Sequence, residues 1–222
     1  MKNLNIKAFG GLLYLFIVVS ASLFLAAWTL DYWQAWVFLA VFFVSVTVIF
    51  IYLAKNDPNL LARRLNTVEQ EKGQKIIQFM IQLSFLTVLI FPAIDHRFRL
   101  SAAPWYAVIA GDVLVVLSLL IIFLVFKENT FTATTIQVEA GQKVVSTGPY
   151  ALVRHPMYAG ALFLFLGIPL ALGSWWGLLI IFPFASVLVW RSLNEEKFLV
   201  KNLSGYAKYR NEVKYRLIPF IW

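Results

Sequence analysis

Long apolar runs constrain this chain more than any other feature of its sequence. Hydrophobic residues make up 61% of its 222 residues and charged residues only 14%, whereas soluble domains average about 45–50% and about 25%. A helix needs about 20 mostly apolar residues to cross a bilayer. We therefore expect an all-α polytopic membrane protein with six transmembrane helices, at residues 10–30, 33–54, 76–94, 104–126, 157–172 and 175–193.

The connections between these runs predict two helical hairpins. Only Asp31 and Tyr32 separate the first two runs, and aromatic residues around them form an interfacial belt. The first run is longer than the apolar part of a secretory signal and has no small-residue cleavage site before Asp31, so we expect it to be retained. The last two runs divide at Gly173-Ser174 and predict a tight hairpin.

Basic residues predict the orientation of the chain. If the N-terminus is cytoplasmic, only Arg97 and Arg99 among the 19 Lys and Arg residues fall on the outer side. Such a bias is typical of cytoplasmic loops. We expect a multi-pass protein with both termini in the cytoplasm, and a net charge of +8 that faces anionic lipid rather than nucleic acid. The compact N-terminal region suggests that the membrane is a bacterial inner membrane.

Composition excludes several kinds of chemistry. The chain has no cysteine, which removes disulfides, thiolate nucleophiles and cysteine-ligated metals. His96 and His155 are its only histidines and lie far apart in the sequence, so we expect no metal site. Asp112 is the one acid inside a long apolar run, where it is either functional or a helix cap.

Polar residues become dense after residue 126, which suggests two regions. Residues 1–126 form a four-helix transmembrane scaffold with an amphipathic interfacial segment at 55–75. Residues 127–222 form a cytoplasmic loop, the second hairpin and a C-terminal tail, and we expect the active site there. The connection at 127–156 resembles a short polar hairpin that lies over the membrane surface.

The two ends of the second hairpin return to the same membrane surface. Pro156 suits the first turn of a helix, which places His155 at a helix N-terminus. Arg191 and Glu195 lie four residues apart and share a helix face, with Glu196 turned about 100° away. Alone, each feature is compatible with an interfacial residue or a surface ion pair; together they predict a polar site.

The order of motifs across this region resembles a known family. The chain reads GPY-x3-RHP-x-Y-x-G, an apolar hairpin, R-x3-EE-x2-L, GY-x2-Y and finally RLIPFIW. This order is similar to the isoprenylcysteine carboxyl methyltransferase family, in particular its bacterial branch, which is close to the phospholipid methyltransferases. The likeness is strong over residues 142–222 and looser over the preceding spans, including 56–66.

The resemblance implies a membrane methyltransferase that holds S-adenosylmethionine in a cytoplasmic C-terminal pocket and receives an amphiphilic lipid or prenylated acceptor laterally between helices. It implies two catalytic residues: Arg191, which holds the acceptor, and Glu195. The implied cofactor-binding residues are Tyr150, Val153, His155, Tyr158, Gly160, Glu195, Glu196, Tyr206 and Tyr209.

The identity of the acceptor stays open. A carboxylate acceptor needs no base, whereas an amine acceptor needs Glu195 or a neutral His155 to take its proton. Two other functions also remain: an NADPH-dependent membrane sterol or steroid reductase, whose C-terminal half resembles this family, and a membrane protein without enzymatic activity.

Overall fold

Helices account for the fold of this chain. The computed structural model describes residues 2–65, 72–132, 138 and 141–222, and these ranges contain no β-strand. The α-helices are α1 (Lys2–Ala27), α2 (Trp33–Asn56), α3 (Pro58–Leu65), α4 (Lys72–Phe98), α5 (Trp105–Glu128), α6 (Pro156–Ala171), α7 (Ile181–Asn202) and α8 (Tyr206–Glu212). Two short 3₁₀ helices are η1 (Gly148–Ala151) and η2 (Trp176–Ile180). The prediction of an all-α fold is confirmed.

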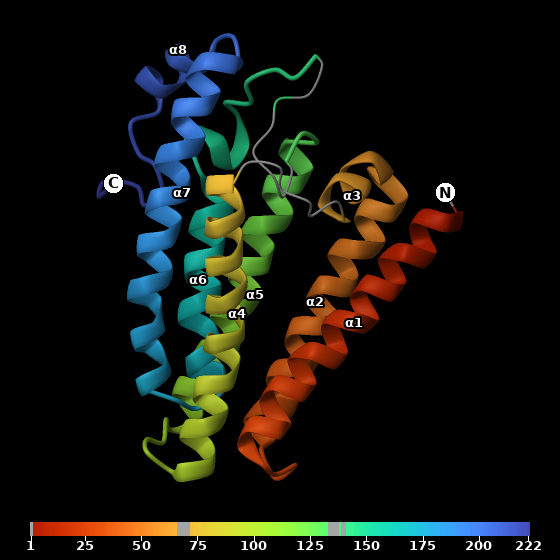
Figure 1. Cartoon of the computed structure of the whole chain (residues 1–222), viewed down its shortest axis with the longest axis vertical. Helices are drawn as coiled ribbons and strands as arrows, with labels where there is room; N and C mark the ends of the chain where they lie inside the picture. The colour runs from red at the N-terminus through yellow and green to blue at the C-terminus, as the bar shows by residue number, and fades with distance from the viewer. Residues whose placement is uncertain (1, 66–71, 133–137, 139–140) are drawn as a thin grey trace.

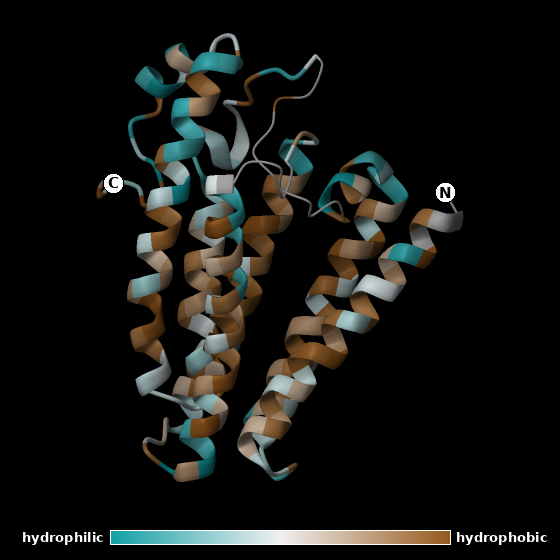
Figure 2. Cartoon of the chain, in the orientation of Figure 1, coloured by the Kyte–Doolittle hydropathy of each residue, from teal (hydrophilic) through white to brown (hydrophobic). Residues whose placement is uncertain are grey.

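Within the described residues, five helical segments are long and apolar enough to cross a membrane: Ile6–Ala27, Trp33–Asn56, Gly73–Phe98, Trp105–Glu128 and Trp176–Asn202. The sixth predicted span is α6, a shorter apolar helix of 16 residues. Figure 2 shows hydrophobic residues along the helix shafts and hydrophilic residues gathered toward their ends. The chain is an integral membrane protein.

The largest difference from the predicted bounds is in α7. We expected the last span to end at residue 193, but α7 continues to Asn202. Residues 194–202 include Glu, Lys and Leu, which favour helix and let it run beyond the apolar segment. Glu195 and Glu196 therefore lie inside this helix, in agreement with the helix face predicted for Arg191 and Glu195.

The helix connections separate into two ends of the molecule (Figure 1). Helices α3 and α8 lie at one end, and both termini lie in the same half of the molecule. The α1–α2 and α4–α5 turns lie at the opposite end. The distribution of basic residues predicts that these two sets of loops lie on opposite sides of the membrane. They do lie at opposite ends of the fold.

The predicted interfacial segment at 55–75 contains one short helix, α3. Asp57 caps it by accepting a hydrogen bond from the Leu60 backbone N–H at 2.9 Å. Residues 66–71 of this segment, and residues 133–137 and 139–140 of the predicted polar hairpin, lie outside the described part of the chain.

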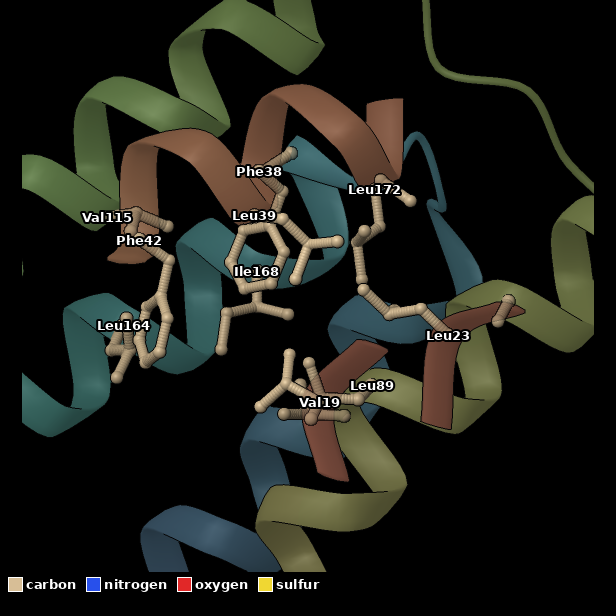
Figure 3. Packing of buried hydrophobic residues seen from close by; sticks show 14 of the residues in the cluster. Val19, Leu23, Phe38, Leu39, Phe42, Leu89, Val115, Leu164, Ile168 and Leu172 are labelled. Carbon is tan, nitrogen blue, oxygen red and sulfur yellow. The ribbon is translucent and has the colours of Figure 1, made fainter. Parts of the chain in front are cut away.

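A hydrophobic core joins the N-terminal hairpin to the other helices (Figure 3). Val19 of α1, Phe38 of α2, Leu89 of α4, Val115 of α5 and Ile168 of α6 are all fully buried in it. Because several helices contribute to this one core, the position of α6 is fixed from more than one side.

Close contact between α5 and α6 sets the position of the start of α6. A Cβ atom at Gly111 would lie only 2.2 Å from the Ala171 backbone nitrogen, and one at Gly167 would lie 3.0 Å from the Gly111 carbonyl oxygen. The Ser118 hydroxyl also donates to the Gly160 carbonyl at 2.8 Å. Small residues let two helix backbones approach in this way inside a membrane.

Polar groups tie the helices together at the end remote from α8. Asp95 is buried and accepts hydrogen bonds from the Ser101 and Ser174 hydroxyls. The Tyr32 hydroxyl donates to the Leu172 carbonyl at 2.7 Å. Asp112 does not cap α5, because it lies two turns inside that helix, where its side chain is buried.

Candidate functional site

A cavity of about 420 Å³ lies at the end of the molecule that carries α3 and α8. Its walls come from α3 to α8 and from the connection between α5 and α6. Cavities of roughly 300–1,000 Å³ are typical of small-molecule sites. The two predicted catalytic residues, Arg191 and Glu195, both line this cavity, and so do five predicted cofactor-binding residues: Tyr150, His155, Tyr158, Tyr206 and Tyr209.

Three other predicted cofactor-binding residues do not line the cavity. Val153 is buried beside it. Gly160 faces α5, where a Cβ atom would meet Ile122 at 3.0 Å. Glu196 is buried in a cluster of ion pairs. The structure gives these residues supporting positions, since they fix the segments that carry the cavity-lining side chains.

Glu196 is the centre of a buried charge cluster next to the cavity. Its Oε1 accepts a hydrogen bond from Arg154 Nε at 2.7 Å and lies 3.3 Å from His155 Nε2. Its Oε2 accepts from Arg216 Nε at 3.2 Å. A buried carboxylate needs such partners, because the loss of its hydration is costly. Glu196 therefore organises three segments around the site.

Arg154 attaches the C-terminal tail to the start of α6. Its Nη1 donates to the carbonyls of Val213 at 2.8 Å and Lys214 at 3.0 Å. The backbone N–H groups of Arg154 and His155 donate to the carbonyls of Tyr215 and Arg216, both at 2.9 Å. One buried guanidinium and two backbone bonds thus hold the tail against the cavity.

A chain of hydrogen bonds runs along the cavity from α7 through α6. Arg191 Nε donates to the Tyr158 hydroxyl at 2.9 Å, and that hydroxyl donates to Glu195 Oε2. The His155 ring lies parallel to the Tyr158 ring, 5.3 Å away, with Nδ1 at 3.8 Å from Glu195 Oε2. The cavity therefore presents a cationic and an anionic group held in fixed relation by one tyrosine.

Tyrosines of α8 and η1 form the wall under the tail. Tyr209 donates from its hydroxyl to the Tyr150 carbonyl at 2.8 Å, and Asn129 Nδ2 donates to the Tyr150 hydroxyl at 3.1 Å. Burial raises the pKa of Tyr150 to about 12 and raises the pKa values of Tyr206 and Tyr209 above their ordinary range. All three are neutral phenols that can donate hydrogen bonds.

The Tyr206 hydroxyl is the polar group that most clearly suggests a bound ligand. It is buried, and within the described parts of the chain it has no hydrogen-bond partner. Buried polar atoms are normally paired, because an unpaired one costs about 1–3 kcal/mol. A ligand that accepts a hydrogen bond from this phenol would relieve that cost.

Sequence reasoning missed three polar residues that line the cavity from the N-terminal region: Arg64, Gln78 and Gln82. For Arg64 a signal was present. It lies four residues after Leu60, which is fully buried, so the two share a helix face that turns inward. The glutamines carry no comparable signal, because isolated amides in an apolar run are common in membrane helices.

The fold defines a polytopic membrane protein, and a cavity lined by polar residues lies at one end of its helices. Residues 106–205 match a family model described as phospholipid methyltransferase. These residues cover 100 of the 222 positions and include most of the cavity-lining segments of α5, α6 and α7.

This match confirms the relation to phospholipid methyltransferases that the order of motifs predicted. It supports a membrane methyltransferase that acts on lipid-like substrates. Comparison with curated proteins gives no match for the chain.

Proposed function

We propose that this protein is an S-adenosylmethionine-dependent membrane methyltransferase that modifies an amphiphilic acceptor. The observation that carries the proposal is the position of Arg191, Tyr158 and Glu195 in one hydrogen-bonded chain along a cavity at the membrane border. Such a cavity can hold a cationic cofactor and an acceptor side by side.

The cavity-lining residues suit S-adenosylmethionine, which carries a sulfonium, an amino group, a carboxylate, ribose hydroxyls and a flat adenine ring. Glu195 is the carboxylate available for the amino group or the ribose, since Glu196 is occupied by its ion pairs. Tyr150 and Tyr209 offer aromatic surface for the adenine. The buried Tyr206 hydroxyl offers a donor. When bound, the cofactor supplies a methyl group already activated for transfer to a nucleophile.

An apolar wall of the cavity suits the hydrocarbon part of an amphiphile. Ile81 of α4, Ile122 of α5 and Phe184 and Leu188 of α7 line it. These residues belong to membrane-spanning segments, so the cavity reaches from the polar end of the molecule to the depth of the lipid. We propose that a lipid or prenylated acceptor enters laterally between these helices.

The main task of the protein in this reaction is to align the acceptor with the methyl group of the cofactor. Correct orientation of two reacting groups contributes several kcal/mol to a reaction of this kind. Arg191 orients the acceptor, and a carboxylate acceptor needs no base. For an amine acceptor, Glu195 takes the proton, with a neutral His155 as the other group within reach.

The distribution of basic residues supports a cytoplasmic cavity. The end with α3 and α8 carries the loops that are rich in Lys and Arg, whereas Arg97 and Arg99 lie by the opposite turn. The proposed location is a bacterial inner membrane with both termini in the cytoplasm.

Isothermal titration of purified protein in detergent with S-adenosylhomocysteine and with NADPH tests this proposal. We expect binding of S-adenosylhomocysteine that is lost or weakened at least about 10-fold in Glu195→Gln, since a hydrogen bond to a charged group is worth about 1.5–3 kcal/mol. Glu212→Gln is the matched control, because Glu212 is exposed and pairs with Lys208 on the surface of α8. Binding of NADPH alone would support a reductase, and binding of neither ligand would contradict both enzymatic functions.

A further inference from the structure

One face of α7 forms a continuous wall of the cavity. Its lining residues follow one another at intervals of three or four positions, which places them on one side of the helix: Phe184, Leu188, Arg191 and Glu195. Phe184 lies seven residues before Arg191, which corresponds to about 10 Å along a helix. Because α7 begins at the end of the molecule remote from α8, this wall leads from Arg191 toward the membrane interior (Figure 1).

The part of the wall beyond Arg191 is apolar. Leu188 and Phe184 are buried there, and Ile81 of α4 and Ile122 of α5 line the same cavity. The tyrosines proposed for the cofactor come instead from η1 and α8, toward the other end of the wall. The apolar section is therefore the part of the cavity that is left for the hydrocarbon chain of an acceptor.

Two stacked phenylalanine rings close this section at its inner end. Among the described lining residues, Phe184 is the one on α7 farthest from α8, and Ala161 is the last one along α6. Phe165 lies one helical turn after Ala161 and does not line the cavity. Its ring is parallel to the Phe184 ring, with 3.4 Å between their centres and 6° between their planes. The two rings therefore form a floor between α6 and α7.

The hydrophobic core of the protein lies directly beneath this floor (Figure 3). Phe165 and Phe184 belong to that core, together with Leu164 and Ile168 of α6 and Val115 of α5. Protein interiors are packed about as densely as organic crystals, so an added methylene group there must displace its neighbours. A chain that reaches the floor consequently has no space in which to continue.

The depth of the apolar section corresponds to a chain of limited length. Carbon–carbon bonds of about 1.5 Å at an angle of about 111° advance an extended chain by about 1.25 Å per carbon. A depth of about 10 Å therefore accommodates about eight carbons. Each methylene group up to that length exchanges lipid for an apolar wall, whereas a longer chain meets the Phe184 ring.

We propose that Phe184 is a specificity-determining residue that limits the length of the acceptor's hydrocarbon chain. The acceptor class is then an amphiphile of medium chain length, with about eight carbons between its reacting group and the end of its chain. Phe165 is a positioning residue, because it acts by stacking on Phe184. This inference rests on the proposed function, which places the reacting group of the acceptor beside Arg191.

Binding at saturating S-adenosylhomocysteine measures the effect of chain length without turnover. The protein is reconstituted in nanodiscs, and affinity is expressed per mole of lipid, so that partition of long chains into the bilayer does not count as binding. The probes cover both acceptor groups: hexanoic, octanoic, dodecanoic and hexadecanoic acids, and the corresponding straight-chain primary amines. In at least one series, we expect affinity to fall at least about 5-fold from the octyl to the hexadecyl member, because overpacking of a core is unfavourable.

Substitutions of Phe184 should move this limit in opposite directions. Phe184→Ala deepens the section and should restore binding of the dodecyl member, whereas Phe184→Trp makes it shallower and should weaken the octyl member relative to the hexyl member. Phe182→Ala is the matched control and should leave the preferred length unchanged, because Phe182 is 68% exposed and does not line the cavity. Affinity for S-adenosylhomocysteine reports whether each variant is folded, and if Phe184→Ala is not, the shift in Phe184→Trp decides.

Two results would overturn the inference. One is the absence of a length limit in both series, which would show that long chains leave the cavity sideways between the helices. The other is a limit that stays at the same length in the folded Phe184 variants. In either case, binding of S-adenosylhomocysteine and methyl transfer by the parent would leave the proposed function standing. Absence of S-adenosylhomocysteine binding by the parent would instead contradict the proposed function itself.

Discussion

Replacement of Arg154 by methionine should detach the C-terminal tail from the cavity. The change keeps a long side chain but removes the charge-assisted bond to Glu196 and two bonds to the carbonyls of Val213 and Lys214. The Arg154 and Glu196 side chains are only 5% and 4% exposed, so the pair is protected from water. Removal of one partner from such a pair costs about 3–5 kcal/mol.

The structure favours the lower end of that range. Glu196 keeps Arg216 and His155 as partners, so its charge is still partly compensated. We expect a loss of about 3 kcal/mol. For a chain of 222 residues, in which 1 kcal/mol corresponds to about 2–4 °C, this lowers Tm by about 6–12 °C.

Thermal unfolding in detergent measures the loss of stability, and limited proteolysis measures the detachment of the tail. A lysine-specific protease should cleave faster at Lys214 in Arg154→Met. The affinity for S-adenosylhomocysteine should also fall, because the His155 backbone N–H is bonded to the Arg216 carbonyl of the tail. Arg210→Met is the control, since Arg210 has an exposed side chain on the same segment. An unchanged Tm together with unchanged protection at Lys214 would show that Arg154 does not hold the tail.

Three further predictions follow from individual positions. Gly111→Ala places a Cβ atom 2.2 Å from the Ala171 nitrogen and should lower the free energy of unfolding by about 1–3 kcal/mol or more, which is measured as a lower Tm. Gly10→Ala is the control and should not lower the Tm, because a Cβ atom there meets nothing within 4 Å. Tyr158→Phe removes the hydroxyl between guanidinium and carboxylate and should reduce methyl transfer by about 10-fold to 100-fold, whereas equal rates would exclude this role. Tyr150 has a pKa of about 12 against about 10 when unfolded, so the folded protein should lose stability as pH rises from 10 to 12. Denaturant titrations should show a shallower loss in Tyr150→Phe, and an identical pH slope would contradict the assignment.

Hydropathy predicted the helices well because a membrane span must satisfy its backbone hydrogen bonds internally and present apolar side chains to lipid. It predicted the ends of the helices less well. α7 runs to Asn202 because helical propensity continues after hydropathy falls. The close approach of α5 and α6 at Gly111 depends on which helices become neighbours, and hydropathy carries no information about that choice.

The candidate site was predictable where topology alone brings residues together. The second hairpin returns His155 and Arg191 to one surface, and both line the cavity. The distinct positions of Glu195 and Glu196 were not predictable, since adjacent residues on a helix differ by about 100° and only the packed tail decides which one faces Arg154. Arg64 was missed because the 55–75 segment has the composition of an ordinary interfacial helix.

The cavity beneath the C-terminal tail is the proposed binding site for S-adenosylmethionine. Ultraviolet photolabelling of the protein in nanodiscs with methyl-labelled S-adenosylmethionine, followed by mass spectrometry of the peptides, tests this claim most directly. We expect adducts on peptides that carry Tyr150, Tyr158, Tyr206 or Tyr209, and we expect excess S-adenosylhomocysteine to suppress them. Labelling confined to other helices, or labelling that S-adenosylhomocysteine does not suppress, would contradict it.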